Sequence, residues 1–299
     1  MVKGLNRKSQ KRALVTGIAG FVGSHMAELL IKENFDVFGI SRWRSKKENI
    51  EHIIDKITIL EADILDPHSL DTIMLEVKPN YIFHLAAQSF VPASWTSPAV
   101  TLEINTVGTA NLFEAVRKTQ ISPVIQIACS SEEYGLVFPE EIPIKETNPL
   151  RPLSPYGVSK LAMDYLGYQY YRSYGLKIVR TRGFNHTGPR RGDVFAESNF
   201  AKQIAEIENG KKEAEILVGN LDAERDYTDV RDMVRGYLFA VKYCDPGEVY
   251  NICSGKSWKI SKVLDYLISI SRVKNIKIKH DPARTRPSDV PILVGDNSK

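Results

Sequence analysis

A phenol and an ammonium group stand four residues apart in the stretch SPYGVSK, where Tyr156 precedes Lys160. On a helix, positions i and i+4 lie on one face, so the two side chains would project side by side. Ser154 suits a helix N-cap and Pro155 suits the first helical turn. A free phenol has a pKa of about 10, and an adjacent ammonium group favours the phenolate. The spacing indicates an acid–base pair; taken alone, it also fits an ordinary surface pair.

A serine follows a buried run elsewhere in the chain. The run VIQIAC, at residues 124–129, is expected to be a strand, and SSEEYG follows it. Ligands of α/β proteins bind beyond the carboxyl ends of parallel strands. Ser130 is therefore placed to hydrogen-bond a substrate oxygen on which Tyr156 acts as acid and base. The combination is more specific than either motif alone.

A glycine-rich turn precedes both motifs. The sequence TGIAGFVG follows an apolar run at residues 13–16 and opens a helical pattern at 21–33. Gly17 permits a tight turn, Gly20 lets the backbone approach a pyrophosphate at a helix N-terminus, and Gly23 lets the helix pack on the strand. In this strand–turn–helix context the spacing favours a dinucleotide site over a turn without a ligand.

The residues after the second strand bear on which dinucleotide is bound. They read GISRWRSKK, with Arg42 and Arg44 and no acid before Glu48. An acid here holds the ribose 2′-hydroxyl of NAD, whereas an arginine accommodates the 2′-phosphate of NADP. We expect NADP rather than NAD; the alternative is a solvated basic loop. Asp63 is expected either near an adenine amino group or as a helix cap.

Strand and helix patterns alternate through the first 183 residues. Strands are expected at 13–16, 36–40, 57–60, 81–85, 124–129 and 176–180, and helices most clearly at 99–118 and 155–174. This alternation predicts an α/β fold with a doubly wound parallel sheet of Rossmann type, covered by helices on both faces. We expect a basic disordered tail at 1–12, an NADP-binding domain at 13–183 plus about 228–253, and a smaller α/β substrate-binding cap at about 184–227 plus 254–299.

Composition argues against several classes of function. The net charge is +4, and subtracting the +5 of residues 1–12 leaves −1 for the rest of the chain, which disfavours nucleic-acid binding. No apolar run could cross a bilayer, and no secretory signal is evident. The three cysteines form no CxxC and fit a reducing cytoplasm, with Cys129 a small buried apolar residue. The six histidines show no ligand spacing, so we expect no metal.

Together these motifs resemble those of the extended short-chain dehydrogenases/reductases, over nearly the whole chain. The resemblance rests on TGIAGFVGS, FHLAAQS, EINTVGT, SSEEYG, SPYGVSK and FNHTGP. The pieces LAAQS, SEEYG, FNHTGPRRG, VGNLDAERD and RPSDVP are most similar to the GDP-mannose 4,6-dehydratases and their relatives, the GDP-4-keto-6-deoxymannose reductases. The resemblance implies NADP, a GDP-linked sugar, hydride transfer at sugar C4, and a homodimer or homotetramer.

For a dehydratase, the resemblance implies the catalytic residues Ser130, Glu132, Tyr156 and Lys160. Tyr156 would take the proton of the 4-hydroxyl while C4 gives hydride to NADP⁺. Glu132 would then remove the C5 proton, water would leave C6, and hydride would return to C6. A reductase needs no C5 base, so Glu132 favours elimination, although reductases also carry SSEEYG. The alternative for Glu132 is a solvated loop acid, which is our interpretation of Glu133.

The resemblance also implies two sets of binding residues. Those for the cofactor are Gly17, Gly20, Phe21, Val22, Gly23, Arg42, Asp63, Ile64, Leu85, Ala86, Ala87, Tyr156 and Lys160. Those for the nucleotide sugar are Ser89, Ser131, Asn185, Arg191, Lys202, Val218, Arg225, Arg286 and Asp289. Arginines suit a diphosphate, although each one alone fits a surface ion pair. Arg190 is an alternative to Arg191, and Asn105 is expected to have a structural part near the site.

The sequence also departs from the family pattern. Ser130 stands where the dehydratases usually carry threonine, and DVFAESNFAK lacks part of the usual basic content. YTDVRD is closer to the reductases, whereas PRRG is closer to the dehydratases. A dehydratase is therefore favoured, with a 4-ketoreductase or an epimerase as alternatives. A non-catalytic relative is disfavoured because Tyr156 and Lys160 are both present.

Two expectations concern the assembly and the end of the chain. Helices near 99–119 and 155–174 build the dimer interface in this superfamily, so Val100, Leu112, Tyr165 and Tyr168 are candidates for it, or for the core. The chain stops at GDNSK, where family members continue, and we expect either a truncated C-terminus or a naturally short variant.

Overall fold

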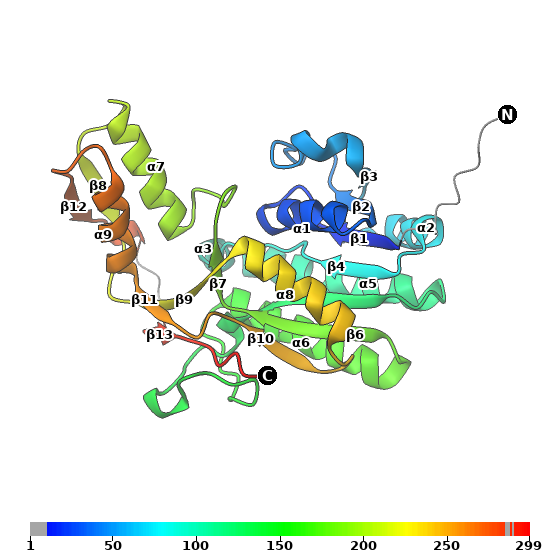
Figure 1. The fold of residues 1–299 in the computed structure, drawn as a ribbon. Helices are drawn as coiled ribbons and strands as arrows, with labels where there is room; N and C mark the ends of the chain where they lie inside the picture. The colour runs from blue at the N-terminus through cyan, green and yellow to red at the C-terminus, as the bar shows by residue number, and fades with distance from the viewer. Residues whose placement is uncertain (1–10, 285–287, 289) are drawn as a thin grey trace.

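A seven-stranded parallel sheet forms the centre of the computed structural model, which describes residues 11–284, 288 and 290–299 (Figure 1). The strand order is β10-β6-β5-β4-β1-β2-β3, and every neighbouring pair is parallel. The strands are β1 (Arg12–Thr16), β2 (Asp36–Ser41), β3 (Thr58–Glu61), β4 (Tyr81–His84), β5 (Val124–Ser130), β6 (Lys177–Gly183) and β10 (Val249–Ile252). The predicted α/β fold of Rossmann type is confirmed. Arg12, which we expected in a disordered tail, instead begins β1, and residues 1–10 lie outside the described residues.

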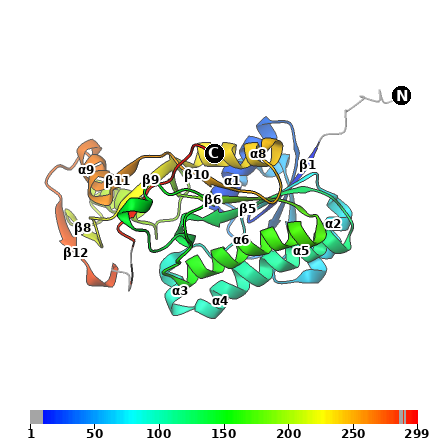
Figure 2. The ribbon, with the colours of Figure 1, turned by 90° about the horizontal axis from the view of Figure 1, so that it is seen from below.

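Helices cover both faces of this sheet. Helices α1 (Phe21–Lys32) and α8 (Val230–Tyr243) lie on one face, and α2 (Pro67–Val77), α5 (Gly108–Lys118) and α6 (Pro155–Tyr174) lie on the other (Figures 1 and 2). Successive strand residues serve opposite faces, since Leu14 packs with the α2–α5–α6 layer and Val15 with the α1–α8 layer. Burial on both faces explains why these strands are continuous apolar runs.

The helix that carries Tyr156 and Lys160 has the bounds that the sequence predicts. The Ser154 side chain accepts a hydrogen bond from the Gly157 amide at 3.0 Å, and Pro155 occupies the first turn. Gly175 ends the helix with φ 71°, a left-handed conformation that glycine adopts without strain. The two functional side chains therefore leave α6 one turn apart, near its start.

The helix predicted at 99–118 is divided into three segments. They are α4 (Pro98–Leu102), a π-helical turn (Glu103–Val107) and α5, and a shorter helix, α3 (Val91–Thr96), precedes them. Asn105 lies in the π turn, where its amide donates to Gln88 O at 3.0 Å and to Ser159 Oγ at 2.9 Å. These bonds join the loop after β4 to α6, in keeping with the structural part expected of Asn105. Single π turns are frequent at functional sites.

A smaller unit follows β6 and lies beyond the carboxyl ends of the central strands (Figure 1). Its elements are β7 (Asn185–Thr187), α7 (Ala196–Glu208), β8 (Glu215–Val218), β9 (Glu224–Asp229), β11 (Ser257–Lys259), α9 (Ile260–Ile270), β12 (Lys277–His280) and β13 (Ile292–Leu293). Strand β8 pairs with β12, and β9 pairs with β7, β11 and β13. Helices α7 and α9 pack on β8 around Phe200, Ile204 and Leu264. Short 3₁₀ turns occur at Glu51–Lys56, Ser131–Glu133, Pro139–Glu141 and Pro282–Arg284.

The candidate subunit-contact residues divide by burial. Leu112 is fully buried in the core, whereas Val100, Tyr165 and Tyr168 are exposed on α4 and α6. Leu112 is therefore a core residue and not a contact residue. Among the described residues, the helices are all too short or too polar to cross a membrane.

Candidate active site

A cleft of about 700 Å³ opens at the carboxyl end of the sheet, beside the point between β1 and β4 where the strand order reverses. Such a switch point is where open α/β sheets bind ligands. The residues predicted for the site that line this cleft are Gly17, Gly20, Phe21, Val22, Gly23, Arg42, Asp63, Ile64, Leu85, Ala86, Ala87, Ser89, Ser130, Ser131, Glu132, Tyr156, Lys160, Asn185 and Arg191. The fold thus brings together side chains that are widely separated along the sequence.

The glycine turn forms one wall of the cleft. Gly17 has φ +70°, and a Cβ on Gly23 would lie 2.2 Å from Gly17 O, so neither position accepts a larger residue without a shift. Opposite the turn, the Leu85 and Ala86 amides both donate to Thr16 Oγ1 at 3.0 Å. The glycines of this wall therefore expose backbone atoms to the cleft at the N-terminus of α1, where anions are favoured.

A buried histidine fixes the strands beneath this wall. His84 Nδ1 lies 2.8 Å from Thr16 Oγ1, and His84 Nε2 lies 2.9 Å from Thr109 Oγ1, so the ring joins β4 to β1 and α5. Burial, and to a lesser degree the charge of Lys160, lowers the pKa of His84 to about 3. The ring is therefore neutral in the folded protein at neutral pH.

We predict that His84 makes the fold less stable in mild acid. The unfolded chain protonates this histidine near pH 6.5, whereas the folded chain does so only near pH 3. Between these values the unfolded state binds more protons, so His84 lowers the free energy of unfolding as the pH falls, by at most about 1.4 kcal/mol per pH unit. Urea unfolding of wild type and His84→Gln at pH 7, 6 and 5 measures this slope. The slope should weaken in His84→Gln and persist in the control His280→Gln, which alters an exposed ring.

The strand-end serine, the phenol and the ammonium group meet in the cleft. Ser130 ends β5 and caps the 3₁₀ turn Ser131–Glu133, with its Oγ accepting from the Glu132 amide at 3.2 Å. The Ser130 side chain is also hydrogen-bonded to the Tyr156 phenol. Lys160 Nζ lies 5.9 Å from the centre of the Tyr156 ring. Glu132 lines the same cleft, so the four predicted catalytic residues lie together.

The electrostatics of the phenol differ from the expectation. Burial raises the pKa of Tyr156, the Ser130 hydrogen bond lowers it, and the Glu132 and Glu133 charges raise it further. Burial also lowers the pKa of Lys160, whose Nζ donates to Ala128 O at 2.7 Å. In this structure desolvation of the phenolate therefore outweighs any help from the ammonium group.

Glu133 is not the solvated loop acid that we expected, because its side chain is 0 % exposed. Its Oε1 accepts from the Ser130 amide at 2.8 Å, and its Oε2 lies 3.2 Å from Arg182 Nε. Burial and the neighbouring Asp164 raise the pKa of Glu133. An arginine from a distant strand explains why the acid can be buried, and the local sequence does not show that contact.

Basic side chains line the end of the cleft beyond β2. Arg42 and Lys46 both line it, whereas Arg44 does not and stacks on the Trp43 ring at 4.7 Å. Asp63 lines the cleft and accepts from the Leu65 amide at 3.0 Å. The cap of α2 is Asp66, so the alternative of Asp63 as a helix cap is wrong.

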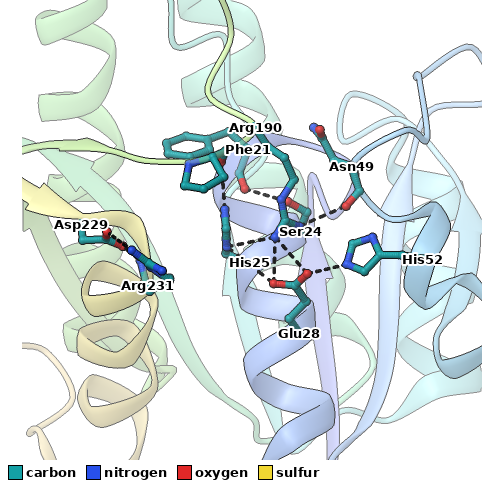
Figure 3. A network of polar contacts seen from close by, with 10 residues as sticks. Phe21, Ser24, His25, Glu28, Asn49, His52, Arg190, Asp229 and Arg231 are labelled. Carbon is teal, nitrogen blue, oxygen red and sulfur yellow. Dashed lines mark hydrogen bonds and ion pairs between the residues drawn. The ribbon is translucent and has the colours of Figure 1, made fainter. Parts of the chain in front are cut away.

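The two adjacent arginines after β7 point in different directions. Arg191 lines the cleft, where its guanidinium lies 4.1 Å from the Phe195 ring centre and pairs with Glu197 at 2.9 Å. Arg190 has φ +71° and turns toward α1, where it bonds Glu28 at 2.9 Å and Asn49 O at 3.1 Å (Figure 3). Arg190 is therefore not an alternative to Arg191 in this cleft.

Three residues predicted to bind the sugar nucleotide do not line the cleft. Lys202 is exposed and pairs with Asp193 at 2.5 Å. Val218 is buried in the core between β8 and helices α7 and α9, and Arg225 is buried and donates to Val290 O at 2.7 Å. Arg286 and Asp289 lie outside the described residues.

The cleft also contains residues that the sequence analysis missed, chiefly Lys46, Gln88, His186, Phe195 and Tyr237. Lys46, in the basic run after β2, and Gln88, in LAAQS, belong to motifs already quoted. Tyr237 had no local signal, because it comes from α8 and reaches the cleft only by packing. His186 Nδ1 lies 2.9 Å from Phe184 O, and burial lowers its pKa to about 4.

Comparison with known proteins places this geometry in a family. Residues 14–299 match the family described as GDP-mannose 4,6 dehydratase. The chain belongs to this family. The resemblance drawn from the motifs is confirmed, and the match covers the glycine turn, the strand-end serine and the Tyr156–Lys160 pair.

Relatives of both activities are similar to this chain. A GDP-6-deoxy-D-mannose reductase of Pseudomonas aeruginosa is 34% identical over 97% of this chain and 89% of its own length. A GDP-mannose 4,6-dehydratase of Vibrio cholerae is 31% identical over 97% of this chain and 87% of its own. Membership of the GDP-mannose 4,6-dehydratase family therefore does not decide between dehydration and reduction.

Solved structures share the fold over nearly all of the chain. The RMD protein of Pseudomonas aeruginosa, complexed with NADPH, has a TM-score of 0.83 and 32% identity, covering 97% of this chain and 90% of that one. A UDP-glucose 4-epimerase of Thermus thermophilus, in complex with NAD, has a TM-score of 0.83 and 28% identity, covering 96% and 90%. Both complexes contain a nicotinamide cofactor.

Proposed function

We propose that this protein is an NADP-dependent GDP-mannose 4,6-dehydratase, which converts GDP-mannose into GDP-4-keto-6-deoxymannose and water. The observation that carries the proposal is the position of Glu132 in the cleft that also contains Ser130, Tyr156 and Lys160. A base for the C5 proton is what elimination needs and simple ketone reduction does not. We include in the proposal the division into an NADP-binding domain and a substrate-binding cap, and a homodimer or homotetramer in the cytoplasm.

The first step is oxidation at sugar C4. The Ser130 side chain and the Tyr156 phenol are hydrogen-bonded to each other. The 4-hydroxyl oxygen of the sugar, if hydrogen-bonded to both, would therefore lie between these two side chains. Tyr156 takes the 4-hydroxyl proton, and Lys160 stands beside its ring. When bound, NADP⁺ would accept hydride from C4 and return it at C6, and its positive ring would favour the phenolate whose formation burial opposes.

The second step is loss of water from C5 and C6. The 4-ketone acidifies the C5 hydrogen, and the Glu132 carboxylate removes it as a proton. The C6 hydroxyl then leaves with a proton as water, and hydride at C6 with a proton at C5 completes the 6-deoxy sugar. The cofactor is regenerated, so the balance is one GDP-mannose to one ketone and one water.

The binding residues follow from the two ends of the cleft. The glycine turn would hold the pyrophosphate of the dinucleotide, because its backbone is bare and a Cβ at Gly23 would collide with Gly17 O. Arg42 and Lys46 would hold a 2′-phosphate. Arg191 would face the diphosphate of the nucleotide sugar, with Asn185 and Ser131 nearer the sugar.

A GDP-4-keto-6-deoxymannose 4-reductase is the second candidate, favoured by the charges near the diphosphate end. Lys202 pairs with Asp193, and Arg191 pairs with Glu197 at the start of α7. Because both cations are paired with carboxylates, this part of the chain carries less positive charge than we expect at the diphosphate site of a dehydratase. Incubation of purified protein with GDP-mannose and NADP⁺ decides between the two. A 4-keto-6-deoxy product supports dehydration, whereas turnover only with added ketone and NADPH supports reduction.

We predict that Arg42→Ala weakens NADP⁺ binding by roughly tenfold or more and leaves NAD⁺ binding within about twofold. Loss of one charge-assisted contact to the 2′-phosphate has an effect of this size. Quenching of protein fluorescence on titration with each cofactor measures both affinities. Arg44→Ala is the matched control, since Arg44 is two residues away but stacks on Trp43 outside the cleft. Equal weakening for NAD⁺ and NADP⁺ in Arg42→Ala would contradict the assignment.

A further inference from the structure

A buried cluster of charged side chains lies behind the strand that ends at Ser130. Its members are Glu133, Asp164, Arg180 and Arg182, whose side chains are at most 10 % exposed. They come from three elements, namely the turn after β5, helix α6 and strand β6. The proposed mechanism uses none of them directly.

Glu133 connects this cluster to the catalytic turn. Its Oε1 accepts from the Ser130 amide at 2.8 Å, while the Ser130 hydroxyl accepts from the Glu132 amide at 3.2 Å. This reciprocal capping box closes the turn Ser131–Glu133. The Glu133 side chain therefore holds the backbone that carries the Ser130 hydroxyl and the Glu132 carboxylate.

The cluster also reaches the helix of the acid–base pair. Arg182 lies 3.2 Å from Glu133 Oε2 and 2.6 Å from Asp164 Oδ2, and Arg180 bonds Asp164 Oδ1 at 2.6 Å. Asp164 is one helical turn beyond Lys160 on α6. A chain of polar contacts thus runs from the strand-end turn through β6 to the helix that positions the phenol.

A metal centre is a poorer interpretation of the same cluster. Cys129 Sγ and carboxylate oxygens of Glu133 and Asp164 lie within 4.8 Å of one another. Both carboxylates, however, already pair with Arg182, and burial raises the pKa of the Cys129 thiol well above its usual value. A cation here would have to displace an arginine and ionise a thiol that burial keeps protonated.

We propose that Glu133 is a positioning residue for the reaction. Its carboxyl group sets the turn that presents Ser130 and Glu132, and through Arg182 and Asp164 it keeps that turn in register with Tyr156 and Lys160. This inference rests on the proposed catalytic roles of those four residues. It adds a residue that touches neither the cleft nor its ligands, since Glu133 does not line the cleft.

Two substitutions at this position separate positioning from general loss of structure. Glu133→Leu keeps the approximate size and removes the acceptor for the Ser130 amide. Glu133→Gln keeps a carbonyl oxygen that can accept from this amide. We expect kcat to fall by about tenfold to a hundredfold in Glu133→Leu, because a shift of about 1 Å in reacting groups has such an effect. Glu133→Gln should retain kcat within about threefold, and KM for GDP-mannose should change by less than about threefold in both.

A matched control is available eight residues away. Glu141 has the same arrangement, since its Oε2 accepts from the Phe138 amide at 2.9 Å in a 3₁₀ turn and its Oε1 pairs with Arg151 at 2.8 Å. Its turn carries no residue of the cleft. Glu141→Leu should therefore keep wild-type kcat. Turnover is normalised to NADP⁺ sites titrated in each variant, so that unfolded protein does not contribute.

Each outcome bears on the proposal. Unchanged kcat in Glu133→Leu overturns it, and so does an equal loss in Glu133→Gln or in Glu141→Leu. If Glu133→Leu does not fold, Glu133→Asp replaces it, because the shorter acid withdraws from the Ser130 amide and should lower kcat similarly. Wild type that does not convert GDP-mannose refutes the proposed function instead. The same comparison is then made with GDP-4-keto-6-deoxymannose and NADPH, where Ser130 and Tyr156 still act.

Discussion

Replacing Tyr156 by phenylalanine should lower kcat by about a thousandfold and leave the affinity for NADP⁺ within about twofold. General acid–base groups contribute about 10²- to 10⁴-fold to rates. Phenylalanine keeps the buried ring beside Lys160 and removes only the hydroxyl that bonds Ser130. Steady-state turnover and cofactor titration on the same preparations measure the two quantities separately.

A second tyrosine on the same helix serves as the control for this substitution. Tyr170 is as buried as Tyr156, and its hydroxyl donates to Glu114 Oε1 at 2.9 Å; neither Tyr170 nor Glu114 lines the cleft. Tyr170→Phe should keep full turnover. Activity retained in Tyr156→Phe, or lost equally in both variants, would mean that the phenol of Tyr156 is not the acid–base group.

Replacing Glu132 by glutamine should stop dehydration at its midpoint. We expect overall turnover to fall by about a thousandfold, because the C5 proton loses its base, while oxidation at C4 still proceeds. Reduced cofactor should therefore accumulate, up to one equivalent per site, when the variant is mixed with GDP-mannose and NADP⁺. Rapid-mixing absorbance of the reduced nicotinamide measures this burst.

The same variant tests the alternative activity. A 4-ketoreductase requires no C5 base, so Glu132→Gln would then reduce GDP-4-keto-6-deoxymannose with NADPH at a rate within about threefold of wild type. Glu140→Gln is the control for both assays, because Glu140 is an exposed acid in the 3₁₀ turn Pro139–Glu141. Dehydration that continues unimpaired in Glu132→Gln would remove the observation on which the choice of reaction rests.

The pKa of the phenol explains how activity could depend on the cofactor. Burial raises the pKa of Tyr156, and the acids beside it act in the same direction. A cation placed in the cleft shifts the balance toward the phenolate, because in a buried site its charge is little screened. We therefore expect the proposed site to take a proton from the substrate only when the oxidised cofactor is bound.

Much of the dinucleotide half of the site could be predicted from short stretches of sequence. The turn at Gly17 and Gly23, the cap at Ser154 and the spacing of Tyr156 and Lys160 depend on neighbours within a few residues, which local spacing shows. The buried strands were equally predictable, because a strand covered on both faces is a continuous apolar run. These local features predict the fold and most of the residues that line the cleft.

The remainder depends on residues that approach one another only when the chain is packed. Glu133 is buried because Arg182 lies against it, and Arg190 turns from Arg191 because Glu28 and Asn49 offer it partners. Lys202, Val218 and Arg225 match motifs and yet do not line the cleft, because the packing of α7, β8 and β9 gives each of them another partner. Charge type can be predicted from sequence. The residue that pairs with a charged side chain is often distant in the sequence. That partner decides whether the charged side chain faces a ligand, the solvent or the core.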